Sequence, residues 1–268
     1  MTMLQCPLCK NTTEKLIDSH VLPQQFYKLI NELNKKNSIK HGNKLQLEKI
    51  QLNPKKNKLM NTDKEWKEHL LCEDCEILFR TKERELNLFL REMFGLNKRT
   101  TTKNGLTHKY AQDIKYTILS IFIRQYYSKK YTLEERRANN FNSIPKTVIE
   151  KIEQYLQGKS DIYIDMIIQI NRHSDHCCIF TEVLHNCQNG TYLFSILLFD
   201  ICILITYNPQ NLTQKDSYLP VHLDFRQTTP KDFPINMHLE ATKQIIKNTD
   251  MSSKTAQFFN SLPLKLSK

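Results

Sequence analysis

Residues 70–94 read LLCEDCEILFRTKERELNLFLREMF, a Cys-x-x-Cys pair followed at once by an amphipathic pattern. After Cys75, apolar residues recur three and four positions apart, the spacing that places side chains on one face of a helix. We therefore expect a helix that begins near Cys75, directly at the pair that it forms with Cys72. The expected buried face of this helix consists of Leu78, Phe79, Leu86, Phe89, Leu90 and Phe94.

A second Cys-x-x-Cys pair lies near the N-terminus, where CPLC supplies Cys6 and Cys9. Zinc takes four soft or borderline ligands in a tetrahedron, and two such pairs provide four thiolates. The first residues, MTMLQCPLCK, carry no apolar segment of the length that an export signal needs. We therefore expect a reducing, cytoplasmic location, where this spacing indicates a metal site rather than disulfides. The sequence predicts a structural Zn²⁺ bound by Cys6, Cys9, Cys72 and Cys75.

The charge balance of the chain favours a polyanionic partner. Lys and Arg number 39 against 28 acids, which gives a net charge of +11 over 268 residues. Apolar residues make up 40% of the chain, so general disorder is not expected. Nucleic acid, DNA or RNA, is the expected partner, ahead of an anionic membrane surface. The candidate phosphate contacts are Lys55, Lys56 and Lys58 in the lysine-rich segment 34–67, and Arg124.

The lysine-rich segment leaves two interpretations open. It can form a phosphate-facing arm, with a short hairpin over KLQLEKIQL (residues 44–52), or it can be a solvated loop. Arg124 also has two: a contact with nucleic acid, or an ion pair with an acid in the core.

The most apolar run, YLFSILLFDICILITY at residues 192–207, does not predict a membrane span. It is shorter than the ~20 residues that a spanning helix needs, and it carries Asp200 in its middle. We expect two buried strands or one long bent strand, and no membrane partner.

The rest of the chain predicts an α+β fold. The apolar spacing predicts further helices over about 23–33, 109–128, 132–141 and 145–157, and near the end over 239–250 and 254–263. After Gly158, short β-rich runs are expected at 162–170, 176–186, 191–199, 201–208 and 219–225. Asn-Gly at 189–190 is a hairpin signal. The expected organisation is an N-terminal zinc module, residues 1–95, and an α+β body, residues 96–268, composed of a helical segment and a β-rich part.

With both cysteine pairs in view, LIDSHVLPQQF at residues 16–26 completes a resemblance to a known family. Residues 6–95 resemble the HNH nucleases, which have a treble-clef, ββα-metal fold. In many members the cysteine pairs hold a structural zinc, and a His followed by Pro serves as general base. The residue before that His and the residue after the last Cys bind a catalytic divalent ion. The resemblance implies that His20 is the base.

The positions expected to hold the catalytic ion depart from the family pattern. Ser19 occupies the first one and Glu76, which follows Cys75, occupies the last; a carboxylate suits Mg²⁺ or Mn²⁺ better than a hydroxyl does. Glu83 lies two turns after Glu76 on the same helix face. We expect His20, Glu76 and Glu83 to converge as catalytic residues, with Asp18 or Asp74 assisting.

The Asn that orients the base in the family has no plain counterpart in EWKEHLLC, which offers Lys67, Glu68 and His69.

The resemblance implies a metal-dependent endonuclease that hydrolyses phosphodiester bonds of DNA or RNA. The wider pattern, which includes LSIFIR at 119–124, also resembles bacterial HNH-like proteins suspected of defence against phage. The alternative is a non-catalytic zinc module that binds nucleic acid, with a C-terminal body that recognises a protein partner or a ligand. The oligomeric state stays open.

Several candidate residues have a structural interpretation beside the functional one. His20 can cap a helix or bond a backbone carbonyl, Glu76 can favour a helix N-terminus, and Glu83 can form a surface ion pair. The ligand-rich stretch HSDHCCIFTEVLHNC (173–187) can hold a second metal or form part of a core strand. Trp66 can stack on a base or pack over the zinc module.

Overall fold

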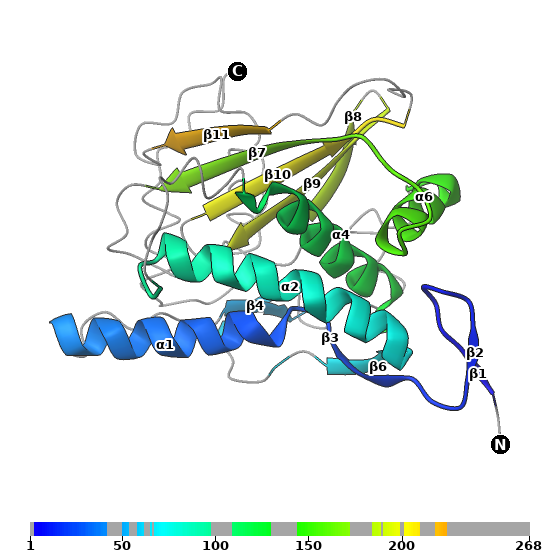
Figure 1. Ribbon diagram of the computed structural model, residues 1–268, viewed down its shortest axis with the longest axis horizontal. Helices are drawn as coiled ribbons and strands as arrows, with labels where there is room; N and C mark the ends of the chain where they lie inside the picture. The colour runs from blue at the N-terminus through cyan, green and yellow to red at the C-terminus, as the bar shows by residue number, and fades with distance from the viewer. Residues whose placement is uncertain are drawn as a thin grey trace.

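The computed structural model shows a mixed α+β chain in stacked layers. A five-stranded sheet is covered by α4 (Ala111–Tyr127), α4 packs on α2 (Glu73–Met93), and α1 (Gln24–His41) packs on α2 (Figure 1). The structure describes residues 3–41, 50–53, 58–61, 65, 67–97, 109–129, 144–171, 184–188, 190–198, 201–209 and 218–223.

Short strands precede α2 and shape the N-terminal part of the molecule. Strands β1 (Leu4–Gln5) and β2 (Thr12–Thr13) pair around the first cysteine pair. Strand β3 (Ile17–His20) pairs antiparallel with β6 (Lys67–Leu71), and we call these two strands the ribbon. Between them the chain forms α1 and the antiparallel pair β4 (Ile50–Asn53) and β5 (Lys58–Asn61).

The five-stranded sheet contains β7 (Ile164–Asn171), β8 (Leu184–Gln188), β9 (Thr191–Leu198), β10 (Ile201–Tyr207) and β11 (Tyr218–Leu223). Its strand order is β11-β7-β10-β9-β8, in which only the β11–β7 pair is parallel. The apolar run 192–207 therefore forms two antiparallel strands, one of the two alternatives that the sequence left open. Within the described part of the chain, no helix combines the length and apolarity that crossing a membrane requires.

The Asn-Gly hairpin signal is confirmed. Strands β8 and β9 pair antiparallel with Gln188 opposite Thr191, which leaves a two-residue connection. Gly190 has a φ of 76°, a conformation that side chains with a Cβ rarely adopt.

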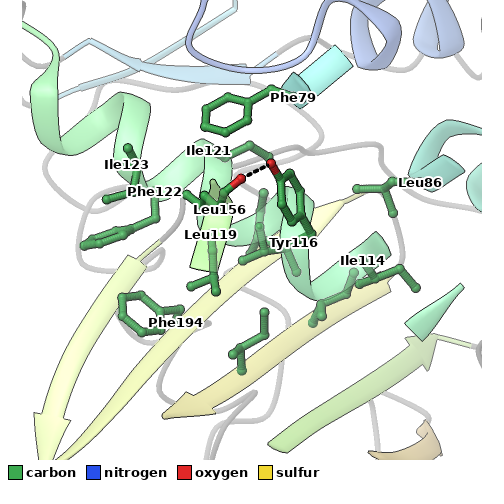
Figure 2. Close-up of a cluster of buried hydrophobic side chains, with 14 of the residues drawn as sticks. Phe79, Leu86, Ile114, Tyr116, Leu119, Ile121, Phe122, Ile123, Leu156 and Phe194 are labelled. Carbon is green, nitrogen blue, oxygen red and sulfur yellow. Dashed lines mark hydrogen bonds between the residues drawn. The ribbon is translucent and has the colours of Figure 1, made fainter. Parts of the chain in front are cut away.

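Helix α4 is the centre of the core because it is covered on both sides. Phe122 packs on Phe194 of β9, with ring centroids 4.7 Å apart. On the other side Tyr116 packs edge-on against Phe79 of α2, and its hydroxyl donates to the carbonyl of Leu156 at 2.6 Å (Figure 2). Helix α6 (Lys146–Leu156) also contacts α4.

One continuous cluster of buried side chains runs from the cysteine pairs through α2 and α4 to the sheet. The division expected at residue 95 stays a prediction, and the core itself extends across it. Phe79, Leu86, Phe89 and Leu90 are buried, as the periodicity predicted. Leu78, in contrast, is 38% exposed.

The other helix predictions have mixed outcomes. Helix α1 is longer than the expected 23–33, and α4 and α6 lie where the sequence placed helices, with Pro145 at the N-cap of α6. The helices expected over 132–141, 239–250 and 254–263 lie outside the described residues.

Candidate metal centre and adjoining histidine site

The four cysteines of the two pairs converge, as the sequence predicted. Their sulfur atoms all lie within 4.8 Å of one another. The Sγ atoms of Cys6 and Cys75 are 3.8 Å apart, and those of Cys9 and Cys72 are 3.7 Å apart. A tetrahedral zinc with Zn–S bonds of about 2.3 Å separates its sulfur ligands by about 3.8 Å. The cluster can therefore hold a metal ion such as zinc with little rearrangement.

Local backbone geometry places each cysteine pair. The first pair lies in a turn in which the Lys10 amide donates to the Cys6 carbonyl at 2.9 Å, and Lys10 adopts a φ of 64°. The second pair begins α2, because Cys72 is the N-cap residue. The Cys72 amide points at the Cys6 sulfur from 3.4 Å. These backbone groups preform the site and favour negative charge on sulfur.

The thiols interact electrostatically. The hydrogen bond between the sulfur atoms of Cys6 and Cys75 lowers the pKa of Cys6 to about 4, and the same bond, together with burial, raises the pKa of Cys75. One thiolate is thus stabilised in the cluster, and a metal ion would have to displace the remaining protons.

Helix α6 holds the first cysteine turn from the side. Buried Glu153 accepts a hydrogen bond from Lys10 Nζ at 3.0 Å and another from the Tyr127 hydroxyl. The side-chain amide of Gln157 donates to the carbonyl of Leu8 at 3.1 Å. The metal centre is therefore fastened to α4 and α6 by side chains, as well as to α2 by Cys72 and Cys75.

His20 lies at the end of β3 and bonds a carboxylate. Its Nε2 is 2.8 Å from Oε2 of Glu65, and Lys67 Nζ is 3.1 Å from that same oxygen. The side chains of His20, Glu65 and Lys67 are 20%, 27% and 37% exposed. The hydrogen bond from His20, followed by the contact with Lys67, lowers the pKa of Glu65, so this carboxylate is ionised at neutral pH. We call these three residues the histidine cluster.

The register of the ribbon decides which side chains share the face of His20. His20 is opposite Lys67 and Asp18 is opposite His69, and alternate strand residues point to the same side. Asp18 and His69 are exposed there. His69 Nδ1 lies 3.2 Å from the carbonyl oxygen of Leu16.

Ser19 points to the opposite side of the ribbon. It is 1% exposed, and its hydroxyl donates to the Ile17 carbonyl at 3.3 Å. Its cross-strand neighbour Glu68 accepts hydrogen bonds from the Ser128 hydroxyl and, at 2.9 Å, from the Lys129 amide. The position expected to hold the first ligand of the catalytic ion is therefore directed into the protein.

Glu76 and Glu83 bind Arg124, not His20. The Arg124 guanidinium donates to both Glu76 oxygens at 3.2 Å and to Glu83 Oε1, and it stacks over Phe79 with 4.7 Å from Cζ to the ring centre. Arg124, Glu76 and Glu83 are 1%, 7% and 6% exposed. We call these three residues the buried ion pair.

The buried ion pair bears on three sequence assignments. The structure buries Glu76 and Glu83 and pairs both with Arg124, so neither carboxylate faces solvent beside His20. Arg124 itself occupies a core ion pair, the second of its two interpretations, and it is not exposed to nucleic acid.

Other expected site residues cannot be located in the same way. Lys55, Lys56 and Trp66 lie outside the described residues, as does most of the stretch 173–187. Lys58 begins β5, but its side chain is not among those described.

Sequence reasoning missed Glu65. Its only local signal is that it precedes Lys67 by two residues, which places it on the same side of an extended chain.

No protein-family model, curated protein or solved structure matches the chain. Its function must therefore be argued from the geometry of these clusters.

Proposed function

We propose that the chain is a metal-dependent nuclease in which His20 is the general base. The observation that carries this proposal is the hydrogen bond between His20, whose side chain is 20% exposed, and the ionised Glu65 carboxylate. An imidazole bonded to a carboxylate through one nitrogen, and open to water, is a common arrangement for a general base.

The order of elements around the cysteines supports the resemblance to HNH nucleases. The cysteine turn between β1 and β2 comes first and is followed by the β3–β6 ribbon. Helix α2 then starts at the second cysteine pair, as the helix does in a treble clef. Zinc bound by Cys6, Cys9, Cys72 and Cys75 would fix the ribbon against α2. His20 on the ribbon would then be held in a constant position.

The chemistry follows from the free nitrogen of His20. When Nε2–H donates its hydrogen bond to Glu65, Nδ1 is left to remove a proton from water, whose oxygen attacks phosphorus as the ester P–O bond breaks. A divalent ion such as Mg²⁺ or Mn²⁺ would supply stabilisation of the charge that develops on the phosphate oxygens. Asp18, exposed on the His20 face, fits such an ion, since Mg²⁺ often uses one or two carboxylates and keeps several waters. Lys67 on the same face suits a phosphate.

The proposal is tested by cleavage of supercoiled plasmid DNA and single-stranded RNA by the zinc-loaded protein with Mg²⁺ or Mn²⁺. We expect His20→Ala to lower the cleavage rate by about 10²–10⁴-fold, the usual contribution of general base catalysis. His69→Ala is the matched control, because it removes an exposed histidine from the same face of the same ribbon. Equal losses in both variants, with both folded, would argue against a special role for His20.

A second candidate is a zinc module that binds nucleic acid without cleaving it. The buried ion pair favours this alternative, because it removes Glu76 and Glu83 as ligands for a catalytic ion. Binding of DNA that falls steeply with salt, with no cleavage of either substrate, would support it.

A further inference from the structure

We propose that Glu65 is a positioning residue for His20: its carboxylate accepts a hydrogen bond from Nε2–H and leaves Nδ1 as the only basic nitrogen of the ring. This inference rests on the function proposed above and adds a residue and a tautomer to it. In the resembled family an Asn near this position orients the base, whereas here a charged carboxylate makes the contact.

The geometry makes Glu65 part of the ribbon's edge. His20 is the last residue of β3, and Lys67, the first of β6, lies opposite it. Glu65 precedes Lys67 by two residues and reaches the imidazole with a 2.8 Å contact. The same oxygen, Oε2, also receives Lys67 Nζ at 3.1 Å. The carboxylate is therefore held between two donors.

A purely structural role explains this contact less well. The His20 and Glu65 side chains remain 20% and 27% exposed, and partly exposed ion pairs contribute little to stability. The contact instead determines which nitrogen of the imidazole ring carries the proton. An ionised carboxylate can only accept a hydrogen bond, so the nitrogen facing it must carry the proton.

A carboxylate offers more than an amide during proton transfer. When water loses a proton to Nδ1, its oxygen bonds to phosphorus, the ester P–O bond breaks, and the leaving oxygen takes a proton from solvent. The imidazole is then a cation, and the negative charge of Glu65 stabilises it. A neutral side chain of the same shape would keep the contact but lose this stabilisation.

The test compares Glu65→Gln and Glu65→Asp with the wild-type full-length, zinc-loaded protein. Long-range ¹H–¹⁵N NMR spectra of the imidazoles report the tautomer, with His20→Gln used to assign the His20 signals. Cleavage kinetics with Mg²⁺ report kcat and KM. Glu14→Gln is the matched control, because Glu14 is an exposed acid outside both clusters.

We expect the wild-type His20 to show the Nε2–H tautomer and Glu65→Gln to show a mixture of tautomers. We expect kcat to fall on the order of 100-fold in Glu65→Gln, within the range of general base catalysis, with KM changed by less than about threefold. Glu65→Asp should restore part of the rate, and Glu14→Gln should match the wild type.

Two results would overturn the proposal: a His20 tautomer unchanged in Glu65→Gln, or a loss of kcat that Glu14→Gln reproduces. If the wild type cleaves no substrate, the nuclease proposal fails, and the spectra alone decide whether Glu65 positions His20. A tautomer that changes only in the Glu65 variants would still support that contact.

Discussion

The buried ion pair and the histidine cluster are built from similar groups but differ in exposure. Arg124 and its two glutamates are sealed between α2 and α4, and the guanidinium donates to both acids. The histidine cluster lies at the edge of the ribbon, and between 20% and 37% of each of its side chains is exposed. A buried carboxylate that is paired with a guanidinium stabilises the fold. A partly exposed carboxylate can instead orient a neighbouring side chain that is accessible to solvent. Burial, not proximity to the last cysteine, therefore separates the two roles.

Removal of the metal should destabilise the ribbon, which carries His20 and Lys67 of the histidine cluster. Chelation of zinc, or Cys72→Ser, should lower hydrogen-exchange protection most in β3 and β6, because β6 ends directly before Cys72. Structural zinc contributes about 10 kcal/mol or more to the folding of small modules. Protection in α4 and β9 should change less, since these elements pack on each other through Phe122 and Phe194. Loss of protection at the same rate in the ribbon and in α4 would show that the regions are not separable.

Breaking the buried ion pair should have the next largest effect. Arg124→Met leaves two carboxylates buried without a partner, so we expect a loss of about 3–5 kcal/mol in the free energy of unfolding, measured by urea denaturation. The triple variant Arg124→Met, Glu76→Gln, Glu83→Gln removes all three charges and should recover most of that loss. A loss below about 1 kcal/mol in Arg124→Met would mean that the pair is more hydrated than its exposure indicates.

The ion pair between Glu153 and Lys10 is intermediate in burial between the buried ion pair and the histidine cluster. Its side chain is 6% exposed, but its partner Lys10 is 52% exposed. Glu153→Gln weakens the contacts with Lys10 and Tyr127, and we expect it to cost about 1–3 kcal/mol. Gln154, one position along α6, supplies the control Gln154→Glu. A cost as large as that of Arg124→Met would contradict the proposed dependence on burial.

The smallest effect should be the pH dependence that Glu65 contributes. Because its hydrogen bond with His20 lowers the folded-state pKa of Glu65, its contribution is present above the unfolded pKa and is lost as pH falls through the folded pKa. Unfolding experiments over the acidic range should therefore show a wild-type advantage over Glu65→Gln at neutral pH that disappears in acid. The difference should stay below about 1 kcal/mol, as for partly exposed pairs. A stability advantage of the wild type over Glu65→Gln that grows as the pH falls would contradict this prediction.

The helices and the cysteine site could be predicted because their signals are local. Apolar spacing identifies α2 and α4, and two Cys-x-x-Cys pairs identify a shared site even with a long segment between them. Asn-Gly likewise fixes the β8–β9 connection from two adjacent residues.

The partners of the charged residues could not be predicted, because they depend on how distant elements pack. His20 and Glu65 are 45 positions apart, and Arg124 and Glu76 are 48 apart. The helix spacing that places Glu76 and Glu83 on one face is correct, but it does not say that this face packs against α4. The inward direction of Ser19 depends on the register between β3 and β6. The sequence does not specify this register, because a long segment separates the two strands.

The most direct test of this account compares cleavage by His20→Ala and Glu76→Gln under the same Mg²⁺ conditions, with zinc content and folding verified in both. Glu76→Gln keeps a hydrogen-bond acceptor for Arg124 and leaves one carboxylate for one guanidinium, so it should fold. We predict that His20→Ala loses at least about 100-fold in rate, while Glu76→Gln stays within about threefold of the wild type. Loss of cleavage in folded Glu76→Gln, with cleavage retained in His20→Ala, would contradict the account.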